Sequence, residues 1–150
     1  MKVKVKKITK FLRGEFECTQ IGLLVLRILP GYLLAKNHGW GKITHPEKWE
    51  WLGSTVTKYF GGALDFANPA IGFVAAFSES ICAVLVLVGL FTQPAAVLVG
   101  GTMFMAAMHH ITTTGSPESA LIYLAIFVAI ALAGPGKYSI DKMFLTKSED

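Results

Sequence analysis

The sequence predicts an all-α integral membrane protein, a four-helix bundle in which a long outward-facing connection joins the first two helices. Hydrophobic residues make up 53% of the chain and charged residues only 16%, whereas about 25% of a soluble domain is charged. The apolar residues also gather into four segments, each close to the roughly 17–25 residues that cross a bilayer core. A length of 150 residues favours a single membrane domain.

Proline and glycine mark the ends of the four segments. Pro69, Pro94 and Pro117 stand where the second, third and fourth helices are expected to begin, a position that tolerates the missing N–H of proline. The sequence "GPGK" from Gly134 is typical of the end of a helix. We therefore expect spans over residues 18–35, 69–90, 94–110 and 117–133.

Basic residues flank the apolar segments at both ends of the chain. The tail 1–17 is rich in lysine, and Lys137, Lys142 and Lys147 follow the fourth segment. Because positively charged flanks tend to stay in the cytoplasm, we expect a multi-pass protein of the plasma (inner) membrane with both termini cytoplasmic. A basic flank of this kind suits anionic lipid. Nucleic-acid binding is not indicated, since no folded basic face with aromatic platforms follows.

The connection between the first two segments, about residues 36–68, is too long for a plain turn. The stretch "HPEKWEWLGSTVTKYF" within it predicts a short helix lying at the membrane interface. Its tryptophans suit the headgroup level. We interpret this helix as an anchor rather than as a lid over a site.

A single acidic residue, Glu79, lies within the apolar stretch "AAFSESICAVLVLVGLF". It shares a helix face with the small residues Gly72, Ala76 and Ala83, which allow close helix packing, so it should face protein rather than lipid. At about 1.5 Å per residue, both Glu79 and Arg27 of the first segment reach the middle of the bilayer. An unpaired charge there costs about 2.5–3.5 kcal/mol. The pattern predicts an Arg27–Glu79 ion pair, which serves either as a proton site or only as a packing device.

A second polar group is expected at the outer ends of the helices. Its members are His38, Lys42, His109 or His110, and Glu118. Imidazole and carboxylate groups can ligate a transition metal, for which His38, His109, His110 and Glu118 are the candidates. Two histidines can also hold haem, and a histidine beside an acid can exchange protons with a quinone. The spacing does not choose among these, and each side chain alone also fits an ordinary interfacial contact.

Three stretches carry a resemblance to a known family. They are "LLVLRILPGYLLAKNHGWGK", "ESICAVLVLVGLFTQPAAVLVGGTMFMAA" and "GSPESALIYLAIFVAIALAGPGKYSID". From Gly22 to Asp141 the chain resembles the DoxX family, through Arg27, a His-Gly-x-x-Lys element, Glu79, Glu118 and the Gly-Pro-Gly-x-Tyr-Ser-x-Asp finish. It departs from the family at Thr92–Gln93–Pro94, where members often carry a basic residue, and in its expanded first connection.

The resemblance implies a small four-helix membrane protein and a membrane subunit of an oxidoreductase system, including quinone-linked systems that handle sulfur compounds. Cys18 and Cys82 have no CxxC spacing, so a redox role would need a cofactor, or a soluble or membrane-bound oxidoreductase partner. A non-enzymatic scaffold that docks a partner protein is the alternative. A small transporter is the third hypothesis and would suit a homo-oligomer, because four helices are few for one chain.

Overall fold

The computed structural model describes residues 18–113 and 115–147, and the regular elements in these residues are all helical. The α-helical class predicted from the sequence is therefore confirmed. The basic tail 1–17 lies outside the described residues. The helices are α2 (Thr19–Leu34), α3 (Trp40–Ile43), α4 (Trp49–Thr57), α5 (Asn68–Phe77), α6 (Ala83–Val88), α7 (Thr92–Thr112), α8 (Glu118–Ala133) and α9 (Ile140–Lys147).

Two π-helical segments join neighbouring helices without a break. η1 (Ala35–Gly39) links α2 to α3, and η5 (Ser78–Cys82) links α5 to α6. The first helix therefore continues to Ile43, beyond the end expected near residue 35. The other three expected segments coincide with helices to within two residues at every end.

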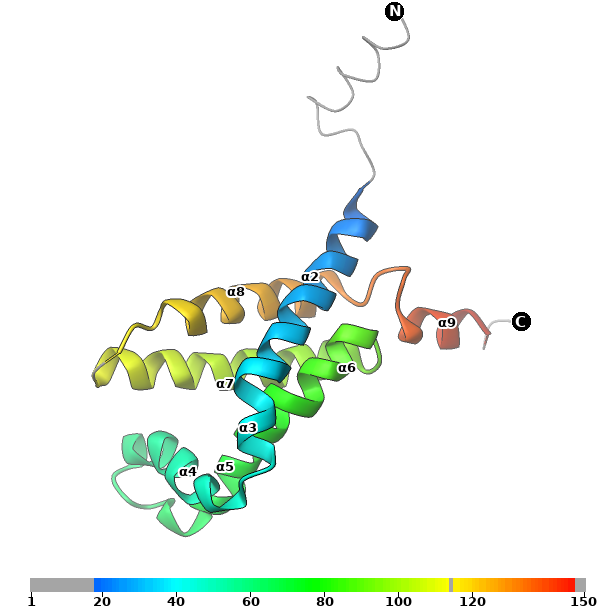
Figure 1. The fold of residues 1–150 in the computed structure, drawn as a ribbon. Coiled ribbons are helices and arrows are strands. Elements are labelled where there is room, and N and C mark those ends of the chain that lie inside the picture. Colours follow the sequence, from blue (N-terminus) through cyan, green and yellow to red (C-terminus); the bar gives the residue numbers. More distant parts are fainter. Residues whose placement is uncertain (1–17, 114, 148–150) are drawn as a thin grey trace, which may run out of the picture.

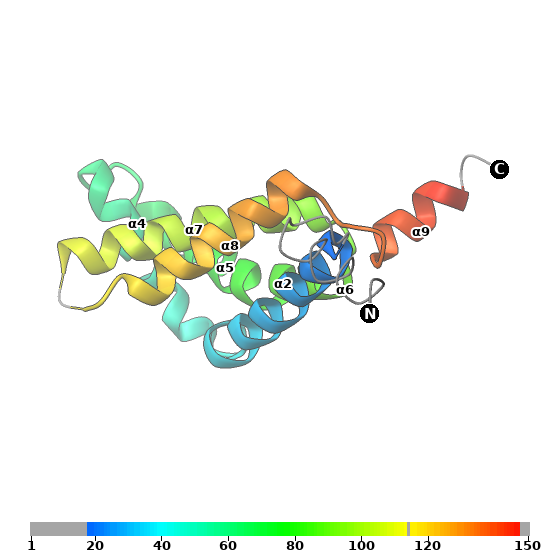
Figure 2. The same ribbon diagram turned by 90° about the horizontal axis from the view of Figure 1, so that it is seen from above.

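Helices α7 and α8 run antiparallel and pack along their lengths, and the first helix crosses them (Figures 1 and 2). The core lies where these helices meet α6. It is formed by Leu34, Ala83, Val86, Ala96, Val99, Phe127 and Ile130, each 1% exposed or less. Within the described part of the chain, Asp65–Val88 and Thr92–Thr112 are long and apolar enough to cross a membrane, and α8 is a shorter apolar helix.

The short helix expected in the first connection is present as α4, and it packs closely along α5 (Figure 1). A Cβ at Gly53 would collide with the backbone of Asn68, and one at Gly72 with the backbone of Trp49. The buried Asn68 side chain accepts a hydrogen bond of 2.7 Å from the Thr57 hydroxyl. The pair α4–α5 is therefore one closely packed unit, which holds α4 at a fixed place.

The loop before α9 contacts α2, and the first turn of α9 contacts the start of α7. The buried Arg27 guanidinium, on α2, donates hydrogen bonds to the carbonyl oxygens of Pro135 and of Tyr138, the latter at 2.9 Å. The Asp141 carboxylate accepts hydrogen bonds of 2.8 Å from the amides of Phe91 and Thr92, and one of 2.7 Å from the Thr92 hydroxyl. The first amides of a helix lack partners within it, so Asp141 caps α7 from a distant part of the chain.

Burial alone would raise the pKa of the Asp141 carboxyl, but hydrogen bonds from Thr92 and Phe91 and the charge of Arg27 outweigh it. The pKa of Asp141 in the folded protein therefore lies below its ordinary value. Such a carboxylate stabilises the fold fully above the unfolded pKa of about 3.9. This stabilisation is lost as the pH falls through the folded pKa.

We therefore expect Asp141→Asn to lower the unfolding temperature of the detergent-solubilised protein at pH 7. The difference in unfolding temperature between this variant and wild type should become smaller below about pH 4. The measurement is the unfolding temperature of both proteins between pH 7 and pH 3. Asp65→Asn, at an exposed position in the segment before α5, is the matched control and should leave the curve unchanged. A difference that does not vary with pH would contradict the capping role of the charge.

Candidate functional site: a buried ion pair between two cavities

The two π-helical segments pack against each other where the first helix crosses the second. Gly39 of η1 lies so close to η5 that a Cβ there would collide with the backbone of Glu79 and Ser80. π-Helical turns inside α-helices are rare and occur frequently at functional sites. The contact puts Lys42, one turn beyond Gly39, level with Glu79.

Lys42 and Glu79 form an ion pair at this crossing. The Lys42 Nζ lies 2.7 Å from Glu79 Oε1 and 2.6 Å from Oε2. Glu79 is only 2% exposed, and the Lys42 side chain is 29% exposed. The Trp49 indole N–H donates a 3.0 Å hydrogen bond to the Lys42 carbonyl oxygen, which ties α4 to the end of the first helix.

The predicted Arg27–Glu79 pair is wrong. Arg27 lies fifteen residues before Lys42 on one continuous helix, or about 22 Å away along its axis. It stands level with Gly89, where a Cβ would lie 2.9 Å from its Nη2. Counting residues from the helix ends placed Arg27 and Glu79 at similar depths in the bilayer. The register between the two helices is instead set by the contact of Gly39 with the Glu79 and Ser80 backbone, which composition alone does not reveal.

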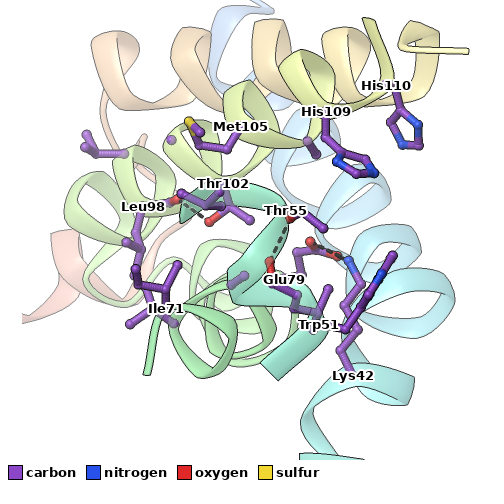
Figure 3. A pocket seen from close by; sticks show the side chains of 17 residues that line it. Lys42, Trp51, Thr55, Ile71, Glu79, Leu98, Thr102, Met105, His109 and His110 are labelled. Carbon is purple, nitrogen blue, oxygen red and sulfur yellow. Dashed lines mark hydrogen bonds and ion pairs between the residues drawn. The ribbon is translucent and has the colours of Figure 1, made fainter. Parts of the chain in front are cut away.

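A cavity of about 440 Å³ lies on one side of the ion pair, between α4, α5 and α7 (Figure 3). Most of its lining is apolar, and its polar side chains include Lys42, Glu79, His109 and His110. Figure 3 shows Lys42, Trp51 and the two histidines toward one end of the lining and Ile71 and Leu98 toward the other. The cavity thus combines an apolar body with a charged end.

Helix α4 forms one wall of the large cavity, a role that was not predicted from the sequence. Trp51, Leu52, Thr55 and Val56 all line the cavity, so α4 covers a site in addition to any role as an anchor. Their spacing of i, i+1, i+4 and i+5 places them on one helix face. Together with the small residues Gly53 and Gly72, this spacing was the available signal.

A second cavity, of about 80 Å³, lies on the other side of the ion pair. It is lined by Lys42 and Glu79 and by further polar side chains of His38, His110, Ser119 and Tyr123. The His38 and Tyr123 rings meet edge to face with 6.0 Å between their centres. His38 and Ser119 are exposed, which places them at the rim of this cavity.

The expected outer cluster is only partly assembled. Both histidines line the large cavity, but His109 is also within 3.1 Å of the Lys58 Nζ and lies edge to face with Trp51. Glu118 is exposed at the start of α8 and lines neither cavity. Among residues 18–113 and 115–147, no group of three or more His, Cys, Asp or Glu side chains could hold a metal ion. The metal candidates His38, His109, His110 and Glu118 therefore do not form a metal site here.

Removal of one partner of the buried ion pair should destabilise the protein strongly, because it leaves the other charge unpaired. We expect Lys42→Met to lower the free energy of unfolding by about 3 kcal/mol, and Lys42→Met combined with Glu79→Gln to recover a large part of that loss. Unfolding by titration with a denaturing detergent measures both values. Lys36→Met, exposed on the same helix, is the control. A double variant no more stable than Lys42→Met would argue against the pair.

Comparison with known proteins identifies the family. The DoxX family profile matches residues 22–112, more than half of the chain. No curated protein and no solved structure matches the chain. The matched residues contain the helix crossing, the ion pair and the lining of the large cavity. The chain therefore belongs to the DoxX family and is an integral membrane protein with at least two apolar helices able to cross the bilayer.

Proposed function

We propose that this protein is the membrane subunit of an oxidoreductase system and that its large cavity binds the headgroup of a quinone. The observation that carries the proposal is the charged end of the otherwise apolar cavity. There the Lys42–Glu79 pair and two histidines meet a lining of aliphatic side chains.

The size and chemistry of the cavity suit such a ligand. Its volume of about 440 Å³ falls within the roughly 300–1,000 Å³ of small-molecule sites, which are also mostly apolar with a few placed polar groups. A quinone has a flat apolar ring and carbonyl oxygens that accept hydrogen bonds, and when bound it would supply electron and proton transfer. The residues present therefore fit the group.

Each polar side chain has a defined role in this proposal. The Lys42 ammonium group has three N–H donors, of which two meet the carboxylate oxygens of Glu79 and the third is left for a ligand carbonyl. The two hydrogen bonds to Glu79 fix the direction of the Lys42 side chain. His109 and His110 line the same cavity and offer further ring nitrogens that can donate or accept a hydrogen bond.

Electrons would have to come from a partner protein. The described cysteines are Cys18, which is exposed, and Cys82, which is buried, and they are too far apart in the sequence to form a CxxC pair. We therefore place the protein beside an oxidoreductase that is soluble or membrane-bound. The exposed residues of α4 and of the segment after it, including Trp51, Phe60 and Phe66, offer a surface for the membrane interface or for that partner.

The membrane arrangement belongs to the same proposal. We infer four crossings in the plasma membrane with both termini cytoplasmic. Exposed apolar side chains on α2, such as Ile21 and Leu29, and on α8, such as Ile122 and Leu132, support lipid contact along the first and fourth helices. In this orientation the connections α3–α5 and α7–α8 face outward, and the ion pair lies toward the outer side.

Filling the large cavity tests the proposal. A Cβ at Gly101 meets open space although the residue lines the cavity, so Gly101→Leu should block the ligand without disturbing the backbone. We expect saturable binding of a short-chain benzoquinone to the wild-type protein in lipid nanodiscs, and binding at least about tenfold weaker in Gly101→Leu, equivalent to about 1.4 kcal/mol. Quenching of tryptophan fluorescence measures it, because Trp51 lines the cavity.

The matched control is Gly22→Leu. Gly22 is also exposed, and a Cβ there also meets open space, but the residue lines neither cavity. Its affinity should equal that of wild type. Lys42→Arg should bind more strongly than Lys42→Met if a donated hydrogen bond holds the headgroup. Non-saturable quenching, or equal loss in both glycine variants, would contradict quinone binding in this cavity.

A further inference from the structure

The Lys42–Glu79 pair forms part of a wall shared by the two cavities. Four residues line both of them, namely Lys42, Glu79, Ala106 and His110. The large cavity on one side is mostly apolar. The small cavity on the other side is lined by four polar side chains in addition to the ion pair, namely His38, His110, Ser119 and Tyr123. The buried carboxylate of Glu79 is thus reached from two different environments.

The small cavity is suited to water. Its volume of about 80 Å³ compares with about 30 Å³ for one molecule in the liquid, and a buried water needs two to four polar partners. His38, Ser119 and Tyr123 supply such partners together with the ion pair. Since His38 and Ser119 are exposed, water can enter from the outer ends of η1 and α8.

His110 provides a second, independent observation. Its ring lines the small cavity, yet its Nδ1 is buried and has no hydrogen-bond partner among the described residues. A Cβ at Gly115 would lie 2.7 Å from this nitrogen, so glycine at that position leaves the ring room beneath the exposed α7–α8 connection. A buried polar atom without a protein partner is commonly satisfied by ordered water.

We propose that the small cavity is a hydrated site through which Glu79 exchanges protons with the outer solution. A proton passes from solvent to water in the cavity, and one proton of that water passes to a carboxylate oxygen of Glu79; the reverse sequence returns it. No electron changes hands, and the water is regenerated. The titratable groups that line this route besides Glu79 are Lys42 of α3, His38 of η1, His110 of α7 and Tyr123 of α8. The proposal does not depend on the ligand of the large cavity.

Radiolytic hydroxyl-radical footprinting of the full-length protein in nanodiscs tests the hydration. Met103 lines the small cavity and is only 4% exposed, so radicals made from water in the cavity should oxidise it quickly. Ala120 also lines this cavity and is buried. We expect Ala120→Leu to slow Met103 oxidation at least about fivefold. Ala125→Leu, at an exposed position on the same helix, should leave it unchanged.

Infrared spectroscopy after a rapid fall in pH tests the proton route. The carboxylic acid band of Glu79 is the one lost in Glu79→Gln, and it should rise at least about tenfold more slowly in Ala120→Leu than in wild type or Ala125→Leu. Slow oxidation of Met103 in the wild type would show a dry cavity and overturn the proposal. An unchanged rate of Glu79 protonation in Ala120→Leu, or no such band at any pH at which the protein is folded, would also overturn it. Neither readout uses a quinone, so failure here is distinct from failure of the proposed function.

Discussion

The contact of Gly39 with the backbone of Glu79 and Ser80 is the constraint on which the rest of the structure depends. No side chain separates the two helices at this point, and each helix has a π-helical turn there. The contact sets the register of the first helix against the second. It places Lys42 opposite Glu79 and, fifteen residues earlier on the same helix, Arg27 opposite Gly89. Both cations, the buried Arg27 and the half-buried Lys42, are therefore positioned by one close approach.

The two cations are stabilised by different partners. Arg27 is held by backbone carbonyls of the loop before α9 and lies near Asp141, the residue in the first turn of α9 that caps α7. Lys42 is held by a carboxylate and lies beside a cavity. Guanidinium has five donors in a fixed fork, which suits several carbonyl oxygens at once, whereas an ammonium group is compact and loses its proton more readily. The arrangement thus separates a fixed structural charge from one suited to interact with a ligand.

Much of the fold could be predicted from the sequence because its signals are local. The prolines at positions 69, 94 and 117 and the glycine at position 134 mark the helix ends, and they follow from the chemistry of one residue at a time. The selection of Glu79, His38 and Lys42 as polar residues of interest also came from local patterns. Glu118 was selected in the same way, but it lies outside both cavities.

The partner of Glu79 could not be predicted in this way, because pairing depends on how far one helix is shifted along another. Arg27 and Lys42 lie fifteen residues apart on one continuous helix, so which of them meets Glu79 is decided by a shift of about four helical turns. Because the predicted first span ended at residue 35, Lys42 lay outside it and was not considered as the partner of Glu79. The small residue at position 39 was the available indication, since glycine within a helix costs about 1 kcal/mol relative to alanine and is retained where backbones must approach closely.

The two cavities give the charged pair a role that packing alone does not supply. A buried ion pair often contributes little net stability, because desolvation offsets the attraction between the charges. Packing alone therefore gives little reason for Lys42 and Glu79 to be there. Between an apolar cavity and a polar one, however, the pair is the one place in the described bundle where a charge borders both environments. This position is the basis of both proposals, in which a ligand is held on one side of the pair and a proton is exchanged on the other.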